Sequence, residues 1–540
     1  SAASDVYKRQ IHAGIYYAPG SQKASFCYSG SKALRNYCEV KEIPFEMVGK
    51  LIIATDKSEL SALDELFRRG SENGVDGLRM VDKDEIGSIE PHSAGIRGIF
   101  SPNTGIIDYQ EVTQSYAEDF KVLGGEVVLD ATVMDISRSP GKLIIESTKG
   151  AIVTDIDGCE RLDFINTMTT MILGHGFQPV IDGVRSQLEN GVGYNAPNTH
   201  QVELARSLCE RIPSLDLVRF TNSGTEATLN TIRAARAFTG RTSFAKVEGG
   251  YHGTHDSVSV SVRVDVSKAG SMDSPEPLAA SEGLPSEILD QVIVLPFNDT
   301  EVALNILQDH RSDLAAVIVE PVMGSVGMVP ATHEFLSMLR SFTQEHGIVL
   351  IFDEVISYRV SPGGCQAHYD ITPDMTALGK IIGGGFPVGA FGGRRDIMEL
   401  YDPRLGPRVS HAGTFNGNPV SMLAGVITLD HLTSRVYQEL EMHGQRLRSE
   451  IHNICIDLEV PAQITGIGSL FGIHFVGHEI QNYRDIADCD TGLRDRVFLG
   501  LMNEGILVAP NLVGALSTET KEAQVAVFAE TFRNVLLRNM

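Results

Sequence analysis

The sequence has 540 residues, more than one hydrophobic core usually serves, and therefore predicts two or three domains. Its 42% hydrophobic content contains no apolar run approaching the ~18 residues that span a membrane, so no membrane association is expected. A formal net charge of -24 argues against a nucleic-acid partner, because phosphate binding needs a basic face. The seven cysteines are widely spaced, without a CxxC pair or a secretory signal, and predict reduced thiols in a cytoplasmic protein.

The first part of the chain carries mixed signals. Residues 1–10, SAASDVYKRQ, lack an initiating Met and an apolar targeting region, so we expect a non-native leader. Residues 11–149 alternate strand and helix patterns, with a strand over 50–55 and a helix over 58–70 that places three leucines on one face. This segment is predicted to be an α+β region of its own.

From residue 151 onward, short apolar strands alternate with amphipathic helices. Strand 314–320 is followed by a helix that Thr332 opens and Gly347 closes, and then by strand 348–353. This βαβ order predicts an α/β fold, a mostly parallel sheet with helices on both faces. The ligand site of such a sheet lies at the carboxyl ends of its strands.

Residues 221–227 form a turn between a predicted strand, 217–220, and a helix that runs to about residue 238. Gly224 allows a close approach of the backbone, and free N–H groups with hydroxyls at a helix N-terminus favour an anion such as a phosphate. Taken alone, such a turn is more often a simple helix cap.

Two further motifs suit a planar, positively charged ligand. In GGYHG, 249–253, flanking glycines present the Tyr251 ring and the His252 imidazole, although a loop with a packed tyrosine is the plainer alternative. The apolar strand IFDEV, 351–355, delivers Asp353 at its carboxyl end, where it would keep a pyridinium nitrogen protonated. A solvated turn carboxylate is the alternative for that residue.

The motif LGKIIGGGFP, 378–387, places Lys380 between an apolar strand and a glycine turn. Partial desolvation there lowers the pKa of the amine and makes it available to form a Schiff base. The alternative, a lysine extending to solvent from a strand end, does not account for the flanking glycines.

Residues 151–540 together resemble the class III, fold type I, pyridoxal-phosphate (PLP) aminotransferases, close to the glutamate-1-semialdehyde aminomutase subgroup. The resemblance rests on motifs in the family's order: NSGTEA, GGYHG, VIVEP, DEV, ALGKIIGGGFPVGA and HAGTFNGNP. It implies a PLP-binding large domain over 150–433, with its N-terminal segment, and a smaller α+β domain over 434–540.

The same resemblance implies roles for individual residues. Lys380 and Asp353 would be catalytic: Lys380 holds the cofactor and moves the proton, and Asp353 pairs with the pyridine nitrogen. The cofactor contacts would come from Ser223, Gly224, Thr225, Tyr251, His252, Glu320, Asp353, Val355, Lys380 and Thr414. Thr414 would reach the phosphate of a neighbouring subunit, which implies a homodimer with shared active sites. No metal is expected.

Residues 11–149 resemble another family, the FAD-dependent L-2-hydroxyglutarate oxidases. The matching segments are IHAGIYY, GKLIIAT and SPNTGIIDY. They cover an internal slice of that family without its GxGxxG dinucleotide turn, so we expect no bound flavin. Whether the fusion is natural or an assembly artefact is left open.

The sequence leaves the reaction open as well. The leading prediction is an aminotransferase that moves an amino group between an amino acid or amine and a keto acid or aldehyde. The alternative is an isomerase, an aminomutase that transfers the amino group within one molecule, and a third is a flavin oxidoreductase formed by the first segment. The resemblance implies that the aminomutase subgroup has a pocket-lining stretch with a carboxylate-binding arginine before the segment that begins at residue 151, so whether the substrate pocket is complete is left open. Arg359 is either a substrate-carboxylate ligand or a surface residue.

Overall fold

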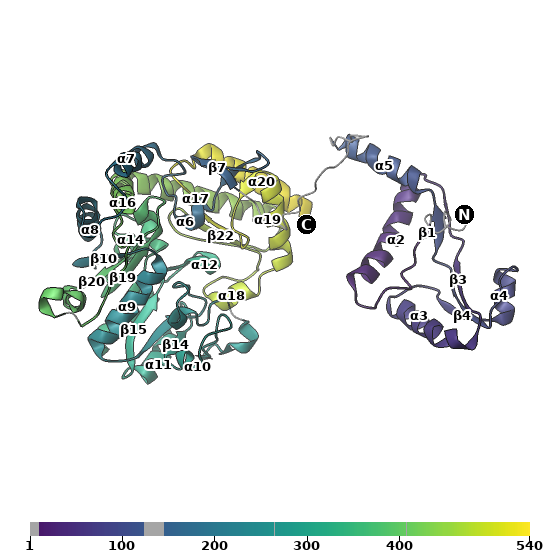
Figure 1. Cartoon of the computed structure of the whole chain (residues 1–540), viewed down its shortest axis with the longest axis horizontal. Helices are drawn as coiled ribbons and strands as arrows, with labels where there is room; N and C mark the ends of the chain where they lie inside the picture. Colours follow the sequence, from purple (N-terminus) through teal and green to yellow (C-terminus); the bar gives the residue numbers. More distant parts are fainter. Residues whose placement is uncertain (1–9, 124–144, 264, 407, 540) are drawn as a thin grey trace. The chain divides into compact units, whose positions relative to one another are not determined.

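The structure is a computed structural model that describes residues 10–123, 145–263, 265–406 and 408–539. The chain divides into two compact units, Ser1–Pro140 and Gly141–Met540 (Figure 1). The predicted leader lies outside the described residues except for Gln10. The predicted domain boundaries at 149/150 and 433/434 stay predictions.

The N-terminal unit contains two small antiparallel sheets, with strand orders β3-β5-β4 and β1-β6-β2. Its strands are β1 (Gln10–Ile11), β2 (Phe45–Glu46), β3 (Lys50–Ala54), β4 (Arg79–Asp82), β5 (Arg97–Ser101) and β6 (Gly105–Ile107), and its helices are α2 (Gln22–Val40), α3 (Leu60–Glu72), α4 (Lys83–Ile89) and α5 (Tyr109–Val122). The predicted strand at residue 50 is therefore present as β3. The predicted helix begins as a 3-10 turn over Lys57–Glu59 that Asp56 caps, and it continues as α3.

A seven-stranded sheet forms the centre of the C-terminal unit, in the order β10-β20-β19-β18-β15-β11-β14. These strands are β10 (Leu217–Thr221), β11 (Ser243–Val247), β14 (Val292–Leu295), β15 (Leu314–Val319), β18 (Val349–Asp353), β19 (Met375–Gly379) and β20 (Gly389–Gly393). Only β20 runs antiparallel to its neighbours among them. The predicted mostly parallel sheet is confirmed.

Helices cover both faces of this sheet, because alternate strand residues point to opposite sides. Ala316 and Ile318 pack with α9 (Gly224–Thr239) on one face. Val317 and Val319 pack with α11 (Thr300–His310) and α13 (His333–His346) on the other. The Thr332 hydroxyl caps α13 by accepting from Phe335 N, and Gly347 ends it at φ 61°, as predicted.

The remaining elements of the C-terminal unit surround the sheet. The longer helices are α7 (Gln178–Glu189), α8 (Thr199–Arg211), α16 (Pro419–His431), α17 (Ser434–Asp457), α19 (Thr491–Asn503) and α20 (Glu522–Asn539). Short helices are α6 (Asn166–Thr169), α10 (Ser286–Leu289), α12 (Gly324–Gly327), α14 (Gly364–Tyr369), α15 (Arg395–Met398) and α18 (Tyr483–Ala487). A sheet of order β21-β22-β24, formed by Gln463–Thr465, Leu470–His474 and Val513–Ala515, packs with α17 and α20.

A four-stranded sheet ties the start of this unit to its C-terminal part. Its order is β23-β9-β8-β7, formed by Ile506–Leu507, Glu160–Asp163, Ile152–Asp155 and Ile145–Lys149. Short strand pairs complete the unit: β12 (Gly270–Ser271) with β13 (Ser274–Pro275), and β16 (Val322–Met323) with β17 (Val329–Pro330).

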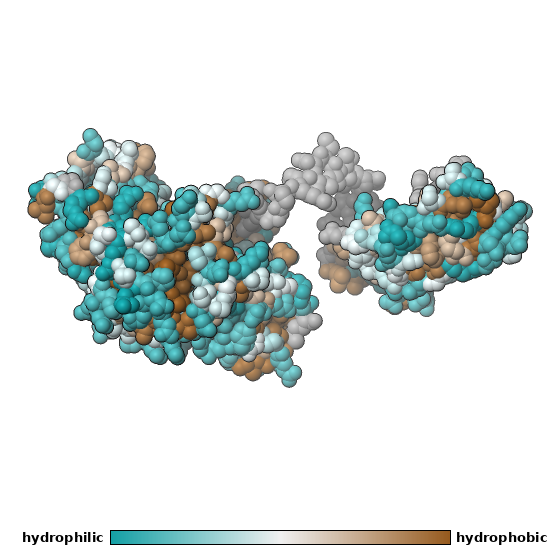
Figure 2. Space-filling view, turned by 90° about the horizontal axis from the view of Figure 1, so that it is seen from below, coloured by the Kyte–Doolittle hydropathy of each residue, from teal (hydrophilic) through white to brown (hydrophobic). Residues whose placement is uncertain are grey.

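The surface of the C-terminal unit is largely hydrophilic in the view of Figure 2, with hydrophobic residues gathered in a strip. No helix among the described residues is long and apolar enough to cross a membrane. All seven cysteines are unpaired in the structure.

Candidate functional site

A cavity of about 380 Å³ lies at the carboxyl ends of the central strands, as expected for an open α/β sheet. Nine of the ten predicted site residues line it; Thr414 does not. The full lining is Thr167, Thr170, Asn222, Ser223, Gly224, Thr225, Tyr251, His252, Gly253, Glu320, Asp353, Val355, Ile356, Lys380, Gly385, Phe386, Pro387 and Val388. The size falls in the range of small-molecule sites.

The N-terminus of α9 forms one wall. The Ser223 hydroxyl caps the helix by accepting from Glu226 N at 3.2 Å. The first N–H groups of a helix have no intrahelical acceptor, so those of Gly224 and Thr225 are placed for an anion. A side chain at Gly224 would meet Val355 at 3.0 Å, which explains the glycine at this close approach.

Asp353 ends β18 in a buried position. Its Oδ2 lies 2.8 Å from Nδ1 of His252, and its Oδ1 accepts from Val355 N at 3.1 Å. Burial lowers the pKa of His252, although the Asp353 carboxylate opposes that shift, so the imidazole is neutral and donates to the carboxylate. The two hydrogen bonds fix the orientation of the Asp353 carboxylate, which lines the cavity.

Glu320 follows β15 and holds the loop that carries Tyr251. Its carboxylate accepts from Tyr251 N at 2.8 Å and from Gly324 N at 3.2 Å. Burial, followed by the nearby charge of Asp353, raises the pKa of Glu320 to about 8. The Tyr251 side chain remains 39% exposed at the cavity wall, where its ring is available to a planar ligand.

Lys380 follows β19 directly and is the first residue of the 3-10 turn Lys380–Gly383. Its φ of 49° lies in the left-handed region, which a non-glycine residue adopts at the expense of strain. Desolvation lowers the pKa of its amine, while Asp353 and Glu320 oppose the shift. A neutral amine, the nucleophilic form, is therefore more accessible than in an exposed lysine.

A left-handed turn at α6 is a cavity element that the sequence reading missed. Asn166, Thr167, Met168 and Thr169 have φ values of 51°, 51°, 50° and 72°. Such residues cost about 1–2 kcal/mol each. Thr167, inside the turn, and Thr170, directly after it, line the cavity. The sequence NTMT contains no glycine, so apart from Asn166 its composition gave no signal for positive φ here.

Arg359 corrects the sequence reading, because it is neither a surface residue nor a cavity residue. It is 1% exposed and donates to Thr169 O at 2.7 Å, to Ser469 Oγ at 3.0 Å and to Leu516 O. Thr169 belongs to the left-handed turn, so Arg359 stabilises that turn without lining the cavity.

Thr414 lines a second cavity, of about 730 Å³, which shares no lining residue with the Lys380 cavity. It is exposed, as is the Phe415 side chain at 65%. Asn222 Nδ2 donates to Asn416 Oδ1 at 2.8 Å, so the loop that carries Thr414 is attached close to the start of α9.

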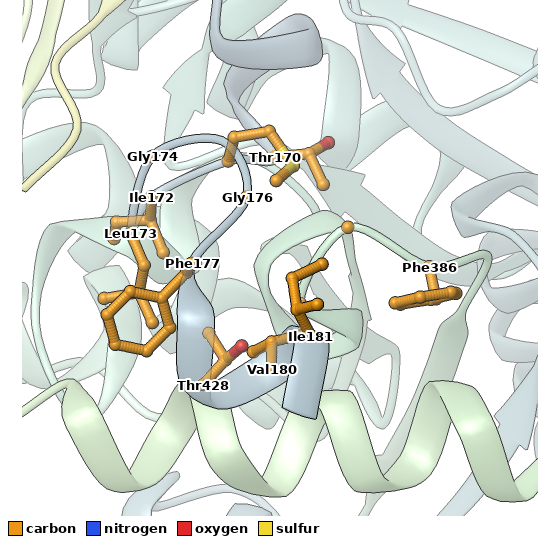
Figure 3. Close-up of a pocket in the computed structure, with 13 residues that line it drawn as sticks. Thr170, Ile172, Leu173, Gly174, Gly176, Phe177, Val180, Ile181, Phe386 and Thr428 are labelled. Carbon is orange, nitrogen blue, oxygen red and sulfur yellow. The ribbon is translucent and has the colours of Figure 1, made fainter. Parts of the chain in front are cut away.

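An apolar pocket of about 140 Å³ adjoins the Lys380 cavity and shares Thr170, Gly385 and Phe386 with it. Figure 3 shows Phe177, with Ile172 and Leu173, on one side and Phe386 on the other, and Thr428 of α16 below. An apolar group that enters from the Lys380 cavity would find an apolar lining here.

The cavity fits PLP in four respects. It offers an amine, a buried carboxylate, a helix N-terminus for the phosphate, and ring contacts from Tyr251 and Val355. His252 Nε2 is buried without a hydrogen-bond partner in the described structure, which is consistent with a missing ligand at this wall. The site thus defines a PLP-dependent enzyme of fold type I.

Comparison with known proteins names the family. The sequence model described as aminotransferase class-III matches residues 134–519, and the chain belongs to that family. The model described as FAD dependent oxidoreductase matches residues 1–188, which confirms the second resemblance at family level.

Individual relatives include both kinds of enzyme. A glutamate-1-semialdehyde 2,1-aminomutase of Methanothermobacter thermautotrophicus is 42% identical over 363 residues, 67% of this chain and 84% of that protein. An omega-transaminase from Sphaerobacter thermophilus is also 42% identical, with a TM-score of 0.73 over 79% of this chain and 97% of that one. A transaminase with PLP bound is 33% identical, with a TM-score of 0.69 over 80% and 98%.

Proposed function

We propose that this class III enzyme is an intermolecular aminotransferase whose amino donor carries an apolar group. The observation that supports it is the composition of the cavity wall. Lys380 is the single cationic side chain among the described residues that line the cavity, and Arg359 is engaged elsewhere. A donor with a distal carboxylate finds no cation there, whereas the adjoining pocket of Figure 3 suits an apolar group.

The residues would divide the work as follows. PLP, when bound, supplies an electron sink for the substrate carbanion. Ser223, Gly224 and Thr225 would hold its phosphate at the α9 N-terminus. Asp353, oriented by His252, would hold the proton on the ring nitrogen.

Lys380 would bind the cofactor covalently and afterwards carry a proton to and from the substrate carbon. Its lowered pKa suits that role, because a group that accepts a proton must be unprotonated at working pH. Tyr251 and Val355 would pack against the two faces of the ring, and Glu320 would fix the backbone of Tyr251.

A homodimer with shared sites is part of the proposal. Thr414 is exposed, lies outside the cavity of its own chain, and is next to the exposed Phe415. This placement supports a contact in which Thr414 donates to the cofactor phosphate of a second copy.

The aminomutase reaction is the second candidate, favoured by the 42% identity to an aminomutase. A panel of amino donors separates the two. The proposal expects amino transfer from donors with apolar side chains that depends strictly on added keto acid or aldehyde. Conversion of glutamate-1-semialdehyde without any acceptor, with no turnover of the apolar donors, would contradict it.

A further inference from the structure

Lys246 carries a buried amine that has no part in the roles described above. It belongs to β11, is fully buried, and does not line the Lys380 cavity. Within the described parts of the chain no carboxylate lies within ion-pair distance of its amine. Burying an ammonium group without such a partner costs free energy, because the charge loses its hydration, and hydrogen bonds must offset that cost.

Two backbone carbonyls provide that compensation. Lys246 Nζ donates to Val247 O at 3.1 Å and to Val260 O at 2.7 Å. These carbonyls stand at the two ends of the loop 248–259, which carries Tyr251 and His252. A single side chain therefore joins the entry and the exit of the loop that forms one cavity wall.

The loop has little regular structure of its own. Within it, only Asp256–Val258 is helical, as a 3-10 turn. It is attached at Gly249 N, which donates to Ser261 O at 2.8 Å, and at His252 O, which accepts from Thr228 Oγ1 at 2.5 Å. Without regular hydrogen bonding, the position of Tyr251 and His252 depends on such individual attachments.

The charge of Lys246 also affects the protonation of His252. Burial lowers the pKa of Lys246 to about 7, against the charges of Glu320 and Glu248. Glu248 already binds Arg484, at 2.7 and 3.0 Å. The positive charge of protonated Lys246 adds to the effect of burial and lowers the pKa of His252 further, so the imidazole stays neutral.

We propose that Lys246 is a positioning residue for the cofactor, which joins the two ends of the loop 248–259 and so fixes Tyr251 and His252 against the ring. The proposal rests on the proposed cofactor contacts of Tyr251 and Asp353. It does not depend on which amino donor the enzyme uses.

The test compares PLP binding by three full-length variants. Lys246→Met removes both hydrogen bonds and the charge, and Lys246→Gln keeps a shorter donor without the charge. Lys521→Met is a control at an exposed lysine. The readouts are the PLP dissociation constant and the visible circular dichroism per bound cofactor, which reports the asymmetric packing of the ring. Neither readout requires amino transfer, so a failed donor panel leaves them intact.

We expect Lys246→Met to raise the PLP dissociation constant at least tenfold and to halve the dichroism of the cofactor that remains bound. Lys246→Gln should give a change of the same sign, and it carries the test if Lys246→Met does not fold. Lys521→Met should match the unmodified chain. Dissociation constants and dichroism of the folded Lys246 variants within twofold of the unmodified chain would overturn the proposal.

Discussion

Asp353 Oδ2 and His252 Nδ1 lie 2.8 Å apart in a buried contact at the end of β18. The imidazole orients the carboxylate without neutralising it, because burial keeps His252 uncharged. A carboxylate held in this way can stabilise a protonated ring nitrogen on the cofactor.

Asp353→Asn is predicted to retain PLP and to lose roughly 100-fold or more in turnover, since a neutral amide does not hold the ring proton. Turnover per bound cofactor is the measurement. The control, Asp370→Asn, changes an exposed residue of the same type and should be neutral. Turnover of Asp353→Asn within a few-fold of the unmodified chain would contradict the role.

Arg359→Met is predicted to lower the free energy of unfolding by about 3–5 kcal/mol, because three buried acceptors lose a charged donor. Chemical denaturation of the cofactor-free protein measures this loss. Arg435→Met, at an arginine whose side chain is 86% exposed, is the control. A loss below about 1 kcal/mol would mean that the left-handed turn does not depend on Arg359.

Thr414→Ala is predicted to weaken PLP retention, because a hydrogen bond to a charged phosphate contributes about 1.5–3 kcal/mol. Mixed dimers locate the effect. Thr414→Ala chains combined with Lys380→Ala chains should form one site with both changes and one with neither. Activity of the mixture no higher than that of either parent would show that Thr414 does not act across an interface.

Deletion of residues 1–149 is predicted to leave PLP binding intact, since every proposed cofactor residue lies beyond that point. The full-length protein should carry PLP and no flavin. Absorption spectra after gentle purification measure both. A stoichiometric flavin spectrum, or a folded, dimeric truncated chain that binds no PLP, would contradict this division of the chain.

Because Lys246 is buried, the free energy of unfolding is predicted to depend on pH. The folded-state pKa of Lys246 is about 7, below the ordinary 10.5, so between these values the unfolded chain binds the additional proton. Its contribution to the free energy of unfolding therefore rises with pH in that window. From pH 8.5 to 10, cofactor-free Lys246→Met should gain less stability than the unmodified chain, as measured by urea denaturation. Equal gains would show that Lys246 titrates normally.

The sequence predicted the parallel sheet, the caps of α13 and nine of the eighteen residues that line the cavity, because each depends on a local pattern or an ordered motif. It did not predict the left-handed turn at Thr167, which long-range contacts from Arg359 and Ala515 hold in place. The position of Arg359 was missed for the same reason. Its acceptors, Thr169, Ser469 and Leu516, are more than 100 residues distant.

The central claim, that Lys380 holds the cofactor, is tested most directly by reduction of the PLP-loaded enzyme with borohydride and mapping of the pyridoxyl label by peptide mass. The account predicts one labelled lysine per chain, Lys380, and no label in Lys380→Ala. A label on Lys246 or any other lysine in the folded, PLP-loaded enzyme would contradict the assignment and the proposed mechanism with it.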